Sequence, residues 1–180
     1  MRFSPNKQNT LIIIPAYNEG GIIGQVVEKV RAQGFEHILV VNDGSTDETE
    51  KVLNAHQVQN TVHKENQGTG AAVKTGIKWG LEKGFEFFLT LDGDDQHYPE
   101  DLPNLLEQLA EYDHVLGSRF LNPDNKIPHH RSLGNQVANT IILLRGVRTT
   151  DSQSGICGFN KKVAEALIQT RSKRYEFWAE

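Results

Sequence analysis

Acidic and amide side chains gather directly after three short apolar runs of this 180-residue sequence, at residues 15–19, 42–47 and 92–96. In the last group Asp92 and Asp94 are two residues apart, so in an extended segment their side chains point to the same side. Carboxylates packed this closely repel each other and raise one pKa, whereas a divalent cation that prefers oxygen ligands relieves the repulsion. The spacing therefore predicts a magnesium or manganese site at residues 92–96.

The predicted ligands of this ion are Asp92, Asp94 and the amide oxygen of Gln96. Two carboxylates and one amide are too few for an octahedral shell, which leaves positions for water and for phosphate oxygens of a substrate. A diphosphate is therefore the expected partner. Simple capping of the following helix is the structural alternative. An EF-hand is excluded, because its sixth position would be His97 and its twelfth Pro103, where Gly and Glu are required.

The elements that must bring these groups together are short strands alternating with longer helical segments. This alternation predicts a single α/β domain over residues 1–180, with a mostly parallel central sheet flanked by helices. Ligands of such sheets bind beyond the carboxyl ends of the strands, so the three acidic groups are expected to converge on one site. Strands are predicted at residues 11–14, 38–41, 87–91 and 114–116, with further ones at 61–62 and 155–159, and helices near 20–32, 47–56, 69–83, 100–111 and 133–144.

Two helix starts have specific signals. Ser45 followed by Glu48 is typical of a capping box. Pro99, followed by Glu100 and Asp101, suits a first helical turn, where the missing N–H of Pro and the negative charge of the acids are both favourable.

Composition excludes several classes of protein. The 23 acidic and 19 basic residues give a net charge of −4 without a basic run, so no nucleic-acid partner is expected. The single cysteine, Cys157, excludes an internal disulfide framework and indicates a reducing, cytoplasmic location. The longest apolar stretches are far shorter than the roughly 20 residues of a membrane span. Association with the cytoplasmic face of a membrane would therefore be peripheral. The end of the chain, with Phe177 and Trp178 and no helix-ending signal, favours truncation at the C-terminus.

The three ordered motifs resemble glycosyltransferase family 2, and within it the dolichyl- or polyprenyl-phosphate mannosyltransferase branch. The resemblance covers residues 11–180. It implies the nucleotide-diphospho-sugar transferase (GT-A type) fold and an inverting transfer of a sugar from a nucleotide donor, GDP-mannose or a UDP-hexose. The motifs are Pro15-Ala16-Tyr17-Asn18-Glu19, Asn42-Asp43-Gly44-Ser45-Thr46-Asp47 and Asp92-Gly93-Asp94-Asp95-Gln96-His97.

The resemblance also implies roles for individual residues. Asp94, with the phosphate-binding Arg119 and Arg131, would carry catalysis. Asp92, Gly93, Asp94 and Gln96 would lie at the metal and diphosphate. The remaining donor-binding residues would line the nucleoside pocket: Pro15, Tyr17, Glu19, Val41 and Asp43.

The acceptor is less specified than the donor. The branch implies a lipid phosphate, although Cys157 stands where the branch commonly has Arg, and Asn42 stands where the family often has Asp. A saccharide hydroxyl as acceptor, or a non-catalytic sugar-nucleotide-binding module, are the alternatives. A nucleotidyltransferase is disfavoured, because residues 15–19 are not the Gly-rich basic loop that such an enzyme carries after its first strand. Among the histidines only His97, beside the metal motif, is a candidate for the site.

Overall fold

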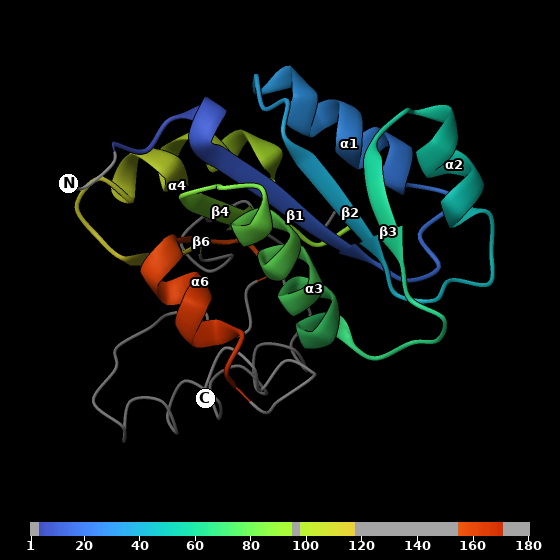
Figure 1. Ribbon diagram of the computed structural model, residues 1–180. Coiled ribbons are helices and arrows are strands. Elements are labelled where there is room, and N and C mark those ends of the chain that lie inside the picture. The colour runs from blue at the N-terminus through green and yellow to red at the C-terminus, as the bar shows by residue number, and fades with distance from the viewer. Residues whose placement is uncertain (1–3, 95–97, 118–154, 171–180) are drawn as a thin grey trace, which may run out of the picture.

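In the part of the chain that the structure describes, six strands form one sheet in the order β3-β2-β1-β4-β6-β5 (Figure 1). The structure is a computed structural model that describes residues 4–94, 98–117 and 155–170. β1 to β4 are parallel, and β6 runs antiparallel between β4 and β5. The predicted mostly parallel α/β sheet is confirmed. The strands are β1 (Thr10–Ala16), β2 (Ile38–Asn42), β3 (Gln59–Val62), β4 (Phe87–Thr90), β5 (His114–Leu116) and β6 (Cys157–Asn160).

The central strands are buried on both faces because both faces are covered by helices. Every residue of β1, β2 and β4 is buried, which explains why these strands are continuous apolar runs rather than alternating ones. β3, at the edge of the sheet, is polar and partly exposed. β1, β2 and β4 therefore have the apolar composition of strands in the core of a parallel sheet.

Two layers of helices sandwich the sheet (Figure 1). One face is covered by α1 (Ile23–Ala32), α2 (Thr49–Ala55) and α4 (Leu102–Gln108), whose apolar side chains form one core cluster with β1, β2 and β4. The opposite face is covered by α3 (Thr69–Glu82) and α6 (Lys161–Leu167), which form a second cluster. Short 3-10 turns, η1 (Lys7–Asn9) and η2 (Pro99–Asp101), precede β1 and α4.

Helix α3 lies unusually close to the sheet because it carries glycine where it crosses the strands. A Cβ at Gly76 would lie 2.5 Å from Cγ2 of Ile13, and one at Gly80 would lie 2.5 Å from Cε1 of Phe88. Larger residues at these positions would push the helix outward. The close contact fixes α3, and with it the loop that precedes it, relative to β1.

The predicted capping box at Ser45 and Glu48 is wrong. Helix α2 begins later, at Thr49, and Glu48 makes no side-chain capping bond. The Ser45 hydroxyl instead accepts a hydrogen bond from the backbone N–H of Asn18 (2.9 Å). Asp47 satisfies the start of the helix, because its Oδ1 accepts from the N–H of Thr49 (3.0 Å). The second predicted helix start, at Pro99, is confirmed: Pro99 begins η2, which leads into α4.

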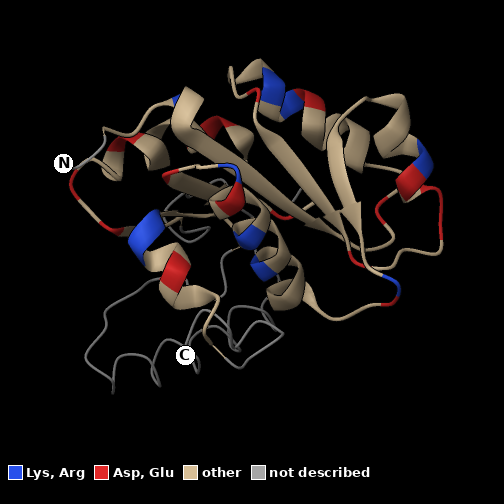
Figure 2. Cartoon of the chain, viewed as in Figure 1, with Lys and Arg blue, Asp and Glu red and all other residues tan. Residues whose placement is uncertain are grey.

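Charged side chains are spread over the helices rather than collected on one of them. Figure 2 shows Lys and Arg on α1, α2, α3 and α6, interspersed with acidic residues. None of the helices that the structure describes is both long and apolar enough to cross a membrane. The helix predicted at residues 133–144 and the aromatic residues Phe177 and Trp178 lie outside the described residues.

Candidate functional site

A cavity of about 340 Å³ opens at the carboxyl ends of β1, β2 and β4. The three acidic loops that were expected to converge there all contribute to its wall, together with the start of α3. The position is the one where ligands of open α/β sheets bind. The lining residues are Pro15, Ala16, Tyr17, Glu19, Asp43, Asn66, Gly68, Thr69, Asp92, Gly93 and Asp94.

Hydrogen bonds between the loops after β1 and β2 hold this wall together. Asn18, in a left-handed backbone conformation (φ 57°), donates its N–H to Ser45 Oγ and accepts from the N–H of Thr46 at 2.8 Å. One residue on, the N–H of Glu19 donates to Thr49 Oγ1 at 2.9 Å. The N–H of Gly20 donates to Asp47 Oδ2 at 3.0 Å. The polar residues of the second loop therefore position the first loop, and with it Tyr17 and Glu19.

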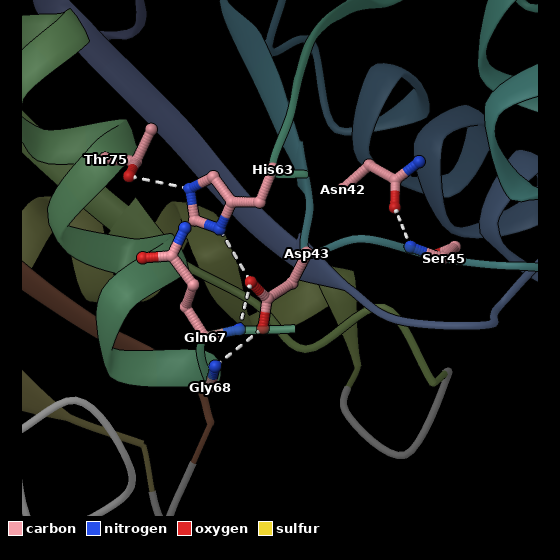
Figure 3. Close-up of polar contacts among 7 residues, drawn as sticks. All are labelled: Asn42, Asp43, Ser45, His63, Gln67, Gly68 and Thr75. Atoms are coloured by element: carbon pink, nitrogen blue, oxygen red, sulfur yellow. Dashed lines mark hydrogen bonds and ion pairs between the residues drawn. The ribbon is translucent and has the colours of Figure 1, made fainter. Parts of the chain in front are cut away.

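The loop before α3 is tied to the end of β2 through Asp43, which is 3% exposed (Figure 3). Its carboxylate accepts from the N–H of Gln67 at 3.0 Å and from the N–H of Gly68 at 2.8 Å. Gly44 follows with φ 75°, and a Cβ there would lie 2.5 Å from the carbonyl carbon of Glu65. Only glycine fits this contact without a shift of backbone, so Gly44 lets the two loops meet.

Negative charge accumulates on one part of the wall. The pKa of Glu19 is raised above its ordinary value, first by burial and then by the charges of Asp94, Asp47 and Asp92. Among residues 4–94, 98–117 and 155–170, no group of three or more His, Cys, Asp or Glu is arranged to hold a metal ion. Of the predicted ligands, the structure places Asp92 and Asp94 at the cavity, both from a single loop. This set fits an ion that takes the rest of its shell from outside the protein.

Most of the predicted donor residues that the structure describes line the cavity, but one does not. Val41 is fully buried in the core cluster under α3, two residues before Asp43 and deeper in the sheet. It contributes to packing and does not reach the cavity wall. Gln96, Arg119 and Arg131 lie outside the described residues, as does His97.

The structure adds residues that the sequence did not single out. His63 contacts Asp43 from the end of β3, and its other ring nitrogen contacts Thr75 of α3 (Figure 3). The pairing of β2 with β3 would have revealed this contact. Asn42 pairs with Val62, so the residues that follow them, Asp43 and His63, lie side by side. Without that register His63 looks like any polar residue after an edge strand.

A second cavity, of about 430 Å³, lies at the opposite ends of the strands, where β4 begins and β6 ends. Both lysines that line it are paired with carboxylates. Lys161 contacts Glu86 and Lys162 contacts Asp113, each at 3.3 Å. None of the described residues of the three acidic loops lines this cavity.

Relatives in sequence agree on one family. The family whose pattern matches is described as Glycosyl transferase family 2, over residues 11–168. The chain is 34% identical to UDP-N-acetylglucosamine–dolichyl-phosphate N-acetylglucosaminyltransferase of Methanococcus voltae, an alignment that covers 94% of this chain and 76% of the relative. It is 35% identical to polyprenol monophosphomannose synthase of Mycolicibacterium smegmatis, with 94% of this chain and 69% of the relative covered.

Solved structures show the same fold. Glucosyl-3-phosphoglycerate synthase from Mycobacterium tuberculosis, in complex with Mn²⁺, UDP-glucose and phosphoglyceric acid, superposes with a TM-score of 0.67 at 17% sequence identity. The match covers 86% of this chain and 57% of that one. The sheet is therefore of the GT-A type, as the motifs implied, and the chain belongs to glycosyltransferase family 2.

Proposed function

We propose that this chain is the donor-binding catalytic domain of an inverting, metal-dependent glycosyltransferase that moves a sugar from a nucleoside diphosphate to a polyprenyl phosphate. The observation that carries the proposal is the shared cavity. One wall holds both Tyr17 and Asp43, which suit a nucleoside, and Asp92 and Asp94, which suit a cation with a diphosphate. These are the two ends of a sugar-nucleotide donor.

The nucleoside end of the cavity offers a surface and an acceptor. The side chain of Tyr17 is 44% exposed, so an aromatic face is available to a base or ribose. Asp43 is an acceptor for a base N–H. Pro15 and Glu19 complete this wall.

The diphosphate end holds the carboxylates of Asp92 and Asp94, and Gln96 follows them in the sequence. These residues would hold Mg²⁺ or Mn²⁺, which supplies positive charge for the departing diphosphate when bound. The pKa of Glu19 is raised first by burial and then by the charges of Asp94, Asp47 and Asp92, so a cation at Asp92 and Asp94 would offset part of this effect. Gly93 keeps the loop close to β1: a Cβ there would lie 3.2 Å from the backbone oxygen of Pro15.

The reaction is a displacement at the anomeric carbon. An oxygen of the acceptor forms the new bond to that carbon while the bond from the carbon to the diphosphate oxygen breaks. The bonding pair leaves with the nucleoside diphosphate, whose added negative charge must be stabilised. In this proposal Arg119 and Arg131, both predicted from sequence, share that task with the residues at the cation.

A phosphate acceptor needs no general base, because its oxygen is already anionic near neutral pH. The relatives named above, one a dolichyl-phosphate and one a polyprenol enzyme, support a lipid phosphate. Such an acceptor would bring the domain to the cytoplasmic face of a membrane by peripheral association. Because those relatives use differently named sugars, both UDP- and GDP-linked donors belong in the test.

The test is calorimetric titration of the purified chain with UDP-N-acetylglucosamine, UDP-glucose and GDP-mannose, each with Mn²⁺ and with chelator. If one donor binds tightly with Mn²⁺ and fails to bind with chelator, the donor assignment is supported. Transfer of labelled sugar from that donor to polyprenyl phosphate then tests the acceptor. Transfer to a saccharide hydroxyl instead would overturn the lipid assignment, and binding without any transfer would indicate a sugar-nucleotide-binding module.

A further inference from the structure

His63 links the end of β2 to helix α3 through two hydrogen bonds (Figure 3). Its Nδ1 lies 2.6 Å from Asp43 Oδ1, and its Nε2 lies 2.9 Å from Thr75 Oγ1. The side chains of His63 and Asp43 are 10% and 4% exposed, so water competes little for these bonds. The backbone N–H of His63 also donates to the carbonyl of Asn42 at 2.8 Å, which fixes the ring beside Asp43.

The direction of each bond follows from the partners. Asp43 already accepts from the N–H groups of Gln67 and Gly68, so its carboxylate is an acceptor and Nδ1 of His63 carries the hydrogen. In the neutral ring Nε2 is then an acceptor, and the hydroxyl of Thr75 donates to it. The carboxylate of Asp43 thus fixes the tautomer, and Thr75 holds the ring from its other side.

These bonds nearly fill the carboxylate of Asp43. A carboxylate offers about four acceptor positions, two on each oxygen. His63 and Gln67 use both positions on Oδ1, while Gly68 uses one on Oδ2. One position on Oδ2 is left for a ligand in the cavity that Asp43 lines.

We infer that His63 is a positioning residue that sets the base preference of the donor cavity by holding Asp43 with this single acceptor position presented to the ligand. The inference rests on the proposed function. A ring N–H, such as that of uracil or guanine, satisfies the position, whereas cytosine and adenine present a ring nitrogen that is itself an acceptor. An unpaired buried acceptor is costly, so the orientation of Asp43 discriminates between bases of nearly equal shape.

The experiment compares matched nucleotides and matched variants. Affinities for UDP against CDP, and for GDP against ADP, are measured calorimetrically with Mn²⁺, and inorganic pyrophosphate with Mn²⁺ reports on the diphosphate end alone. His63→Leu removes both bonds. His63→Asn keeps an N–H donor near the position of Nδ1, and Thr75→Val removes only the hydroxyl that holds the other side of the ring.

In the wild type we expect a preference of at least about tenfold for UDP over CDP, or for GDP over ADP. His63→Leu should lose most of that preference and keep its affinity for Mn²⁺-pyrophosphate, His63→Asn should retain most of it, and Thr75→Val should weaken it partly. A folded His63→Leu variant with an unchanged preference would overturn the inference. So would an equal loss of nucleotide and pyrophosphate binding, because that reports general damage to the cavity.

The wild-type measurements separate this inference from the proposed function. Binding of nucleoside diphosphates with Mn²⁺ but without base preference would overturn the role of His63 and leave the donor cavity standing. Failure of the folded wild type to bind any of the nucleotides or pyrophosphate would overturn the proposed function, and the inference with it.

Discussion

The carboxylate of Asp92 lies directly against Cα of Gly155, so that a Cβ at Gly155 would overlap the carboxyl group. The two residues come from opposite ends of neighbouring antiparallel strands: Asp92 follows β4, and Gly155 precedes β6. Gly155 therefore gives Asp92 the space in which it faces the cavity.

Gly155→Ala should displace Asp92 and weaken Mn²⁺-dependent binding of the nucleotide donor by about tenfold or more. The added methyl should also destabilise the fold by roughly 1–3 kcal/mol through overpacking. Calorimetry and urea unfolding measure the two effects. Gly21→Ala is the control, because a Cβ at Gly21 would meet nothing within 4 Å. Full donor affinity in the Gly155 variant would show that Asp92 needs no such space.

Asp94→Asn should remove most of the Mn²⁺ dependence of donor binding and leave the fold intact, because an amide is a weaker ligand for a hard cation than a carboxylate. Titrations with Mn²⁺ and with chelator measure the effect. Asp101→Asn provides the same chemical change at an exposed position away from the cavity and should bind as the wild type does. Equal Mn²⁺ dependence in the two variants would remove Asp94 from the metal site.

Glu19→Gln should stabilise the metal-free protein at neutral pH and reduce the gain in melting temperature that Mn²⁺ produces. The pKa of Glu19 is raised, by burial first and by Asp94, Asp47 and Asp92 next, so its charged form is unfavourable in the folded state. Stability from this group is present at low pH and is lost as the pH rises above its unfolded pKa. Melting curves at about pH 4 and about pH 7, with Glu107→Gln as control, test this. A variant that melts lower at neutral pH would contradict it.

Cys157 should make the fold sensitive to alkali. Complete burial raises the pKa of Cys157 to about 12 from a reference value of 9.0. The folded protein therefore keeps the thiol proton that the unfolded chain loses, and stability falls as the pH rises from 9 towards 12. Between about pH 8 and about pH 10.5 the loss due to this group is about 2 kcal/mol. Urea unfolding of the wild type should show this extra loss relative to Cys157→Ala, and parallel pH profiles would refute it.

The same burial bears on the acceptor. By its resemblance to the polyprenyl-phosphate branch, the sequence has Cys157 where Arg is common, and the thiol packs in the core with Sγ 3.1 Å from the hydroxyl of Thr90. In this chain, therefore, Cys157 offers no charge to a lipid phosphate. If the acceptor is a lipid phosphate, as proposed, its cation would come from another position, for which the sequence offers Arg131, Arg145 and Arg148.

The sheet and most of the candidate donor wall were predictable because both depend on local patterns. Continuous apolar runs that end in acidic groups mark β1, β2 and β4, and parallel pairing brings their ends together. The start of α2 was not predictable from local sequence. The hydroxyl of Ser45 could have capped its own helix, but in the folded protein it accepts a hydrogen bond from the N–H of Asn18, which is distant in sequence. His63 was missed for the same reason, since its partners Asp43 and Thr75 are distant in sequence.

The register of β5 and β6 has a consequence for the sequence that connects these two strands. Leu116 pairs with Cys157, and the N–H of Gly117 donates to the carbonyl of Ile156 at 2.9 Å, so the described residues on either side of 118–154 lie next to each other in the sheet. Exchange of residues 118–154 for those of a relative would therefore replace Arg119 and Arg131 but none of the residues that pair β5 with β6.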